Sequence, residues 1–188
     1  LKVLENLDLL EEFNLQSRQP QNALFFSSHK KIKKISANVT TSTRRTLFKN
    51  LLDKYHSLDG EIHFGKEVVD IEIENKILTF QDGNSFSVKH IAACDGIKSS
   101  CQEMVLSEFN EPKYSGYYVW RTIFPSEQTN IHFHLGSNFH VVTYPVDNKR
   151  VSLVAAIKSV NKQNESWKEE GSIHNLLSEI PQSIIDNY

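Results

Sequence analysis

Apolar side chains recur along the first third of the chain at the spacing of an α-helix. In "VLENLDLLEEF" the residues near one helical face are Leu4, Leu7, Leu10 and Phe13. In "TTSTRRTLFKNLLDKY" a second apolar stripe consists of Leu47, Phe48, Leu51, Leu52 and Tyr55. Ser42 or Thr43 can cap this second helix, and Gly60 follows it as a helix exit. The pattern therefore predicts two helices before residue 60.

Strand patterns lie between and after these helices. "ALFF" and the Lys-rich stretch that follows it predict two strands joined by a turn. "EVVDIEIEN" alternates, with Val69, Ile71 and Ile73 on one face and acidic residues on the other, which is typical of a half-buried strand. "KILTFQDGNSFSV" predicts two short strands around a turn at residues 81–84. Together these strands predict a small meander.

A short apolar run ends abruptly in Asp-Gly within "IAACDGIKSS", residues 91–100. The run up to Cys94 predicts a buried strand, and the small residues after it predict a turn and a helix start. Asp-Gly is a favoured turn pair in any loop. The ends of strands in open α/β sheets are also where ligands bind. Asp95 and Gly96 are therefore candidate site residues as well as candidate turn residues.

After Pro112 the strands follow one another closely. They are "YYVWRTIF", "NIHFHL", "FHVVTYP" and "RVSLVAAI". Gly136-Ser137-Asn138 predicts a hairpin turn between the second and the third. The tail from Glu165 to Tyr188 predicts a helix that Pro181 interrupts. Its apolar positions are Trp167, Ile173, Leu176, Leu177 and Ile180.

Composition narrows the class of protein. The 188 residues are 39% hydrophobic and 23% charged, with a net charge of −2. The chain therefore lacks the broad positive charge that is typical of proteins that bind nucleic acid or acidic lipid. The basic cluster "HKKIKK" is interpreted as a solvated strand face. No run is long enough for a membrane span. Two cysteines without a signal peptide fit a cytoplasmic, reducing location. The chain begins at Leu1 and has Met104 as its one methionine, so we expect part of a longer protein.

Several familiar chemistries lack the residues they need. The seven glycines form neither a dinucleotide fingerprint nor a Walker loop. His132, His134 and His140 suggest zinc, but no cysteine or carboxylate cluster nearby completes the ligands. A sheet face with polar side chains outward is the favoured interpretation, so no metal is predicted. The potential nucleophiles Ser99, Ser100 and Cys101 lack a nucleophile-elbow pattern and a neighbouring base.

His140 and Tyr144 form a more informative pair. Four residues apart on a predicted strand, they share a face with Val142 between them and lie ~13 Å apart along the strand. Histidine titrates near neutral pH, and a phenolic substrate needs a base to take its proton. The pair is therefore a candidate for proton transfer, although two ordinary sheet residues would leave the same pattern.

Four motifs taken together resemble the single-component FAD-dependent aromatic hydroxylases, the flavoprotein monooxygenases similar to salicylate hydroxylase. They are "TRRTLFKNLL", "ACDGIKSSC", "PKYSGYYVWRTI" and "FHVVTYPV", in the family's order. "VLENLDLLEEF" resembles the family's helix after the first nucleotide-binding unit, so the resemblance runs from about Val3 to Ile157. The chain departs from the motifs at Ala93, Cys94, Lys98 and Gln102.

The resemblance implies FAD as cofactor, NADH or NADPH as co-substrate, and O2 to hydroxylate a small aromatic substrate. By similarity, Arg44 reaches the FAD pyrophosphate, while Asp95 organises a loop and Gly96 lets backbone approach the cofactor. His140 and Tyr144 draw off the phenolic proton, and Arg121 lies near the substrate with Tyr144. For Trp120, core packing is an equal interpretation. A homodimer is compatible with this reading.

The expected fold is α/β, with part of an FAD/NAD(P)-binding domain and a predominantly antiparallel substrate-domain sheet with helices. We expect residues 1–39 to be the first segment of the substrate domain, 40–111 part of the FAD-binding domain, and 112–188 the rest of the substrate domain. The family's N-terminal Gly-rich unit and later Gly-Asp motif are absent, so we expect a middle segment that is inactive alone. Two alternatives stay open: the same fold with other chemistry (epoxidase, halogenase or reductase), or a truncated non-catalytic small-molecule binding module.

Overall fold

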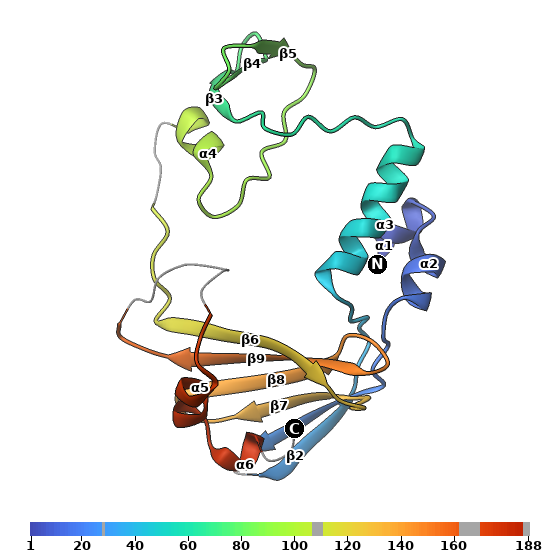
Figure 1. Ribbon diagram of the computed structural model, residues 1–188, viewed down its shortest axis with the longest axis vertical. Coiled ribbons are helices and arrows are strands. Elements are labelled where there is room, and N and C mark those ends of the chain that lie inside the picture. Colours follow the sequence, from blue (N-terminus) through green and yellow to red (C-terminus); the bar gives the residue numbers. More distant parts are fainter. Residues whose placement is uncertain (28, 107–110, 162–169, 186–188) are drawn as a thin grey trace. The chain divides into compact units, whose positions relative to one another are not determined.

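The computed structural model describes residues 1–27, 29–106, 111–161 and 170–185 (Figure 1). The chain forms two compact units: one joins Leu1–Gly60 to Ser115–Tyr188, and the other is Glu61–Tyr114. The sequence-based domain boundaries lay at 39 and 111. The division between compact units follows residues 60 and 114 instead, and the assignment of each segment to substrate or FAD binding stays a prediction.

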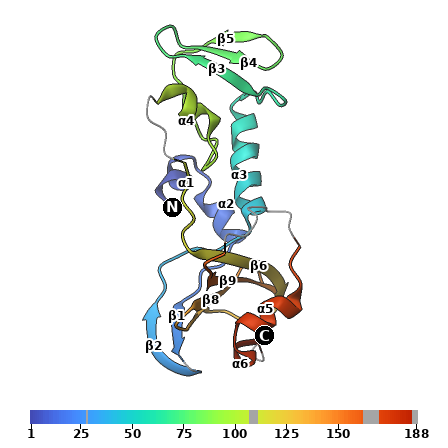
Figure 2. The same ribbon diagram turned by 90° about the vertical axis from the view of Figure 1, so that its left-hand side faces the viewer.

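A six-stranded sheet forms the larger unit, in the order β2-β1-β7-β8-β9-β6. Its strands are β1 (Asn22–Ser27), β2 (Lys30–Ser36), β6 (Tyr117–Pro125), β7 (Ile131–Leu135), β8 (Phe139–Pro145) and β9 (Arg150–Lys158). Only the β1–β7 pairing is parallel, which confirms a predominantly antiparallel sheet. Figure 2 shows β1 beside the edge strand β2.

Alternation along β8 separates the two faces of this sheet. Val141, Thr143 and Pro145 are buried on one face, whereas His140 is exposed on the other. The buried face packs under the two C-terminal helices (Figure 1). The core cluster consists of Val141, Leu153, Ala155, Ile157, Leu176, Ile180 and Ile184. The opposite face, which carries His140, is the open face of the sheet.

The C-terminal segment folds as two short helices, α5 (Ile173–Glu179) and α6 (Gln182–Ile185). They meet at Pro181, where the missing backbone N–H and the ring end the first helix, as the sequence predicts. Leu176 of α5 and its C-cap residue Ile180 are buried. Trp167, which was expected in the same helix, lies outside the described residues.

The expected N-terminal helix is two helices, α1 (Lys2–Asn6) and α2 (Leu10–Leu15). The chain breaks between them at Asp8, whose φ of 56° is incompatible with a continuing right-handed helix. The break lets Leu9 join Leu4 and Phe13 in one buried cluster. A single helix could not bring all three to one contact, so apolar packing overrides the local helical period here.

The helix α3 (Arg44–Ser57) forms where predicted and begins at its cap Thr43. Its apolar stripe is not buried: Phe48 is 60% exposed and Tyr55 is 45% exposed. The buried residue is polar Asn50, whose amide Nδ2 donates to Gln16 Oε1 of the neighbouring segment at 3.1 Å. The helix therefore packs against α2 through a polar contact and leaves the predicted stripe to solvent.

The smaller unit contains a three-stranded meander and one short helix. Its elements are β3 (Val68–Glu72), β4 (Ile77–Phe80), β5 (Ser85–Ser87) and α4 (Ser100–Val105). The predicted buried strand at residues 91–94 is wrong, because this segment forms no strand and Cys94 is exposed. A buried strand needs hydrogen-bonded neighbours on both sides, and the described residues of this unit supply none.

Candidate functional site

An open groove of about 430 Å³ lies in the larger unit, beside the start of α3 and the end of β8. Its lining residues are Phe13, Thr40, Thr41, Ser42, Thr43, Arg44, Leu47 and Tyr144. Arg44 and Tyr144 were each predicted as site residues from separate motifs far apart in the sequence. The fold brings both to one groove, while Arg45 is not among its lining residues.

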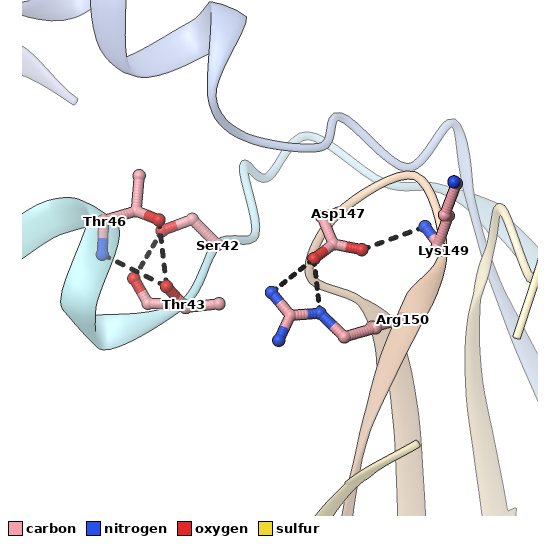
Figure 3. Close-up of polar contacts among 6 residues, drawn as sticks. All are labelled: Ser42, Thr43, Thr46, Asp147, Lys149 and Arg150. Carbon is pink, nitrogen blue, oxygen red and sulfur yellow. Dashed lines mark hydrogen bonds and ion pairs between the residues drawn. The ribbon is translucent and has the colours of Figure 1, made fainter. Parts of the chain in front are cut away.

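Hydroxyl groups fix the first turn of α3 next to this groove (Figure 3). The Thr46 backbone N–H donates to Thr43 Oγ1 at 3.1 Å, which is the N-cap bond. The Thr43 and Thr46 hydroxyls lie 2.9 Å apart, and Ser42 Oγ donates to the Thr43 carbonyl at 3.0 Å. The direction of Arg44 at the start of the helix is therefore set by a well-ordered turn.

The donor set of the groove suits an anion. The Arg44 guanidinium offers a fixed cation with several N–H donors. The Thr40 side chain adds a hydroxyl, and the N-terminus of α3 contributes partial positive charge. The hydroxyls of Thr41 and Ser42 donate within the chain, to backbone carbonyls. A diphosphate group matches the fixed cation at the start of a helix, so the residues present fit the pyrophosphate of FAD.

The turn between β8 and β9 is held by Asp147 (Figure 3). Its carboxylate accepts from the Lys149 backbone N–H at 2.9 Å and from Arg150 Nε and Nη2, each at 2.6 Å. These bonds, the Lys149 N–H first, hold the pKa of Asp147 below its usual value. The Arg150 guanidinium is therefore paired within its own turn.

The structure separates the predicted proton-transfer pair. His140 and Tyr144 do share the open face of β8, with Val142 between them. At ~13 Å along the strand, the two side chains cannot exchange a hydrogen bond directly. Tyr144 lines the groove with Arg44, whereas His140 lies opposite Leu135 and Ala156 farther along the strand.

Arg121 faces the same side of the sheet as this pair. In β6 it lies opposite Val154, which in turn lies opposite Val142 of β8. Antiparallel partners share a face, so Arg121, His140 and Tyr144 surround an apolar floor of Val142 and Val154. Trp120 points the other way, where it packs on the core and its Nε1 donates to Glu179 at 3.1 Å. The core interpretation of Trp120 is therefore the correct one.

The three histidines of the metal hypothesis do not converge. His132 and His134 pair with Thr143 and Val141 and share their face, whereas His140 lies on the opposite one. Phe26 stacks on His134 with ring centroids 4.9 Å apart. Burial, and secondarily the neighbouring histidines, lowers the pKa of His134 to about 4, so it is neutral at pH 7. Within the described ranges no three metal-binding side chains gather.

Asp95 organises the loop before α4 in the smaller unit. Its carboxylate accepts from the Cys101 backbone N–H at 3.0 Å and from Ser99 Oγ at 2.7 Å, which lower the pKa of Asp95 to about 2. Gly96 has φ of 84° with no atom within 4 Å of where a side chain would begin, so the backbone there is open to close approach. Burial and the Asp95 carboxylate raise the pKa of Cys101, which disfavours a nucleophilic thiolate.

Sequence reasoning did not single out Thr41, which links two parts of the groove. Its hydroxyl donates to the Pro145 carbonyl, next to Tyr144. The available signal was the polar run Thr40 to Thr43, which was interpreted only as a source of helix caps. The contact itself joins segments far apart in the chain, so no local pattern reveals it.

No protein-family model matches the chain, but individual proteins do. An FAD-dependent monooxygenase of Aspergillus terreus is 32% identical over 119 residues, which cover 54% of this chain and 27% of the relative. The salicylate hydroxylase of Pseudomonas putida is 27% identical over 165 residues, which cover 73% of this chain and 38% of the relative. The chain thus matches less than half the length of these relatives.

Solved structures share the fold. The tetrameric form of 2-methyl-3-hydroxypyridine-5-carboxylic acid oxygenase aligns with a TM-score of 0.73 at 20% identity, over 85% of this chain and 46% of that one. HpxO of Klebsiella pneumoniae, solved with FAD and uric acid, aligns with a TM-score of 0.73 at 18% identity, over 88% and 46%. With the four motifs, these findings confirm the predicted resemblance: this chain is similar in sequence to FAD-dependent monooxygenases, salicylate hydroxylases among them, and shares the fold of the two solved proteins.

Proposed function

We propose that the protein containing this chain is an FAD-dependent monooxygenase that hydroxylates a small phenolic or carboxylated aromatic substrate with NADH or NADPH and O2. The observation that carries the proposal is that Arg44 and Tyr144 line the same groove. One residue was predicted for the cofactor and the other for the substrate, and their meeting is what a flavin site beside a substrate site requires.

Arg44, with the Thr40 hydroxyl of the same groove, holds the FAD pyrophosphate in this proposal. The fixed guanidinium offsets phosphate charge, and the Thr43-capped turn keeps it pointed at the groove. Bound FAD supplies the redox and oxygen-transfer chemistry, which no side chain of the chain provides. Asp95 and Gly96 are proposed to form the loop that approaches the cofactor, since the loop is ordered by hydrogen bonds and Gly96 leaves space beside the backbone.

The open face of the sheet is proposed to carry the aromatic ring. Val142 and Val154 are register partners on neighbouring strands and form an apolar floor on this face. Arg121 at one side suits a carboxylate, and His140 or Tyr144 accepts the phenolic proton. Because the two cannot hydrogen-bond to each other, each acts as an alternative base and not as a relay.

A second candidate is an apolar substrate, as in epoxidases of the same fold. Much of the open face is apolar and exposed, with Val119 49% and Ile123 50% exposed. A substrate without an ionisable hydroxyl has no use for a base. The response of the enzyme to removal of His140 therefore distinguishes the two candidates.

The test uses full-length protein and a panel of hydroxybenzoates, with substrate-stimulated NAD(P)H oxidation and product per NAD(P)H followed from pH 6 to 9. We expect stimulation by at least one phenol. His140→Asn should lower product formation by about 10²–10⁴-fold, while NAD(P)H is still consumed. His56→Asn, at an exposed position of α3, is the matched control.

Two outcomes contradict parts of the proposal. An unchanged product yield per NAD(P)H in His140→Asn would make His140 an ordinary sheet residue and leave Tyr144 as the base. Stimulation by apolar substrates and by no phenol would favour the epoxidase reading.

A further inference from the structure

We propose that Thr41 is a positioning residue that fixes the spacing between Tyr144 and Arg44 across the groove. That this spacing affects FAD binding and product yield rests on the proposed function. The geometric claim, that Thr41 fixes the spacing, concerns the chain alone and is tested without any cofactor. Nothing in the motifs assigns a role to this threonine.

The first step is the contact of the Thr41 side chain. Thr41 Oγ1 donates to the carbonyl oxygen of Pro145 at 2.5 Å. Pro145 is fully buried at the end of β8, directly after Tyr144. On the other side, Thr41 precedes the Thr43 cap and Arg44. The Thr41 hydroxyl thus joins two segments. One is the end of β8, which carries Tyr144, and the other is the short segment before α3, which carries Arg44.

The second step is that Thr41 is itself held in place. Its backbone N–H donates to the Arg18 carbonyl at 2.8 Å, and the Arg18 N–H donates back to the Thr41 carbonyl at 2.8 Å. This antiparallel bridge fixes the backbone orientation at residue 41. The hydroxyl therefore projects from a restrained backbone and not from a freely moving loop.

The third step is a second link to the same turn. The Arg18 side chain donates through Nη1 to Asn148 Oδ1, in the turn between β8 and β9. Asp147 closes that turn through its bonds to Lys149 and Arg150. The Arg18–Thr41 bridge therefore contacts the β8–β9 end at Pro145, before Asp147, and at Asn148, after it. Two contacts restrict rotation of the bridge relative to this end, whereas one would not.

The Asn50–Gln16 hydrogen bond also holds α3, but it lies farther along the helix, at residue 50. The apolar lining of the groove is less directional. Phe13 and Leu47 line the groove together with Tyr144, but apolar contacts are non-directional and tolerate sliding. A hydrogen bond has a preferred length and angle. We therefore assign the spacing of Tyr144 and Arg44 to the Thr41–Pro145 bond, with the Arg18–Asn148 bond as its support.

The test compares three variants of the full-length protein. Thr41→Val removes the hydroxyl at constant shape, and Thr41→Ser restores it. Thr143→Val is the matched control, because it removes a threonine hydroxyl from the same strand, one that bonds Gln128 at 3.0 Å on the buried face. The readouts are the dissociation constant of FAD, the product per NAD(P)H, and the denaturant midpoint.

We expect Thr41→Val to weaken FAD binding by about 2- to 10-fold, the range of one hydrogen bond, and to lower product per NAD(P)H. Thr41→Ser should restore both. Thr143→Val should lower the denaturant midpoint at least as much while leaving the FAD constant and the yield at wild-type values. Equal effects of Thr41→Val and Thr143→Val, or no effect of Thr41→Val, would overturn the positioning role.

A cofactor-free readout separates this inference from the proposed function. Spin labels at Arg45→Cys and Lys149→Cys, both exposed positions, with other cysteines replaced by serine, report the distance between the start of α3 and the β8–β9 turn. Thr41→Val should broaden the distance distribution and Thr41→Ser should not. An unchanged distribution overturns the geometric claim. A broadened distribution in a protein that binds no FAD supports the geometric claim while refuting the proposed function.

Discussion

The six-stranded sheet unit and the smaller unit, residues 61–114, treat their apolar side chains differently. In the sheet unit, Val141, Val151 and Ala155 are completely buried. In the smaller unit, Ile71 is the single buried apolar residue among those described there, and exposed apolar side chains are common. The most exposed are Phe64, Ile97, Ile73 and Leu106.

The difference shows that forming strands and burying a hydrophobic core have separate physical requirements. Both units form strands where alternation predicts them. A core also needs a second layer, which α5 and α6 supply for the sheet. The smaller unit has α4 alone against β3, and most of its apolar side chains remain uncovered.

The largest predicted effect is on stability and contrasts the two units directly. Leu153→Ala removes a side chain that is 7% exposed within the sheet core, and should destabilise that unit by about 2–4 kcal/mol. Ile73→Ala, at 53% exposed, should cost under about 0.5 kcal/mol. Denaturant unfolding is monitored by hydrogen exchange of β8 and β9 for Leu153→Ala and of β3 and β4 for Ile73→Ala. Comparable losses would show that the smaller unit has a core of its own.

The second prediction concerns acid stability of the sheet unit. Because burial lowers the pKa of His134 to about 4, the unfolded chain binds this proton first as pH falls below about 6.5. The contribution of His134 to the free energy of unfolding should therefore be fully present above about pH 6.5. It should decrease by about 2–3 kcal/mol as the pH falls to 4. His134→Phe should flatten this slope, whatever its effect at pH 7.5, and exposed His56→Phe should not. A slope unchanged by His134→Phe would place the acid sensitivity elsewhere.

A smaller effect is expected at the loop of the smaller unit. Asp95→Asn weakens the acceptor for the Cys101 N–H and should raise exchange of that amide by about 2- to 10-fold. The folded pKa is lowered to about 2, so the contribution of Asp95 is present above about pH 4 and is lost as pH falls toward 2. Asp82→Asn, in the turn before β5, is the control. Unchanged Cys101 exchange would refute the organising role of Asp95.

The sequence predicted the strands well because alternation is local. β6 to β9 and the 136–138 hairpin follow directly from it. Sequence patterns failed where burial or neighbouring segments decide the local structure. They missed the helix break at Asp8 and predicted a buried stripe on α3 that is exposed. They also predicted a strand at residues 91–94, where the described residues supply no neighbouring strand.

The sequence offered candidate site residues one by one but not their arrangement, and their roles stay predictions. Arg44 and Tyr144 came from separate motifs, and their common groove depends on long-range contacts such as Thr41 with Pro145. Register places His140 and His132 on opposite faces of the sheet, which the sequence pattern alone did not decide. Register depends on hairpin geometry, which composition does not reveal.

The most direct test of the account is FAD retention by Arg44→Ala and Arg45→Ala in the full-length protein. Arg44 lines the groove and its neighbour Arg45 does not. We predict that Arg44→Ala weakens FAD binding by about 1.5–3 kcal/mol, or roughly 10- to 150-fold, while Arg45→Ala stays near wild type. Equal flavin content in Arg44→Ala and wild type would contradict the assignment of this groove to the cofactor.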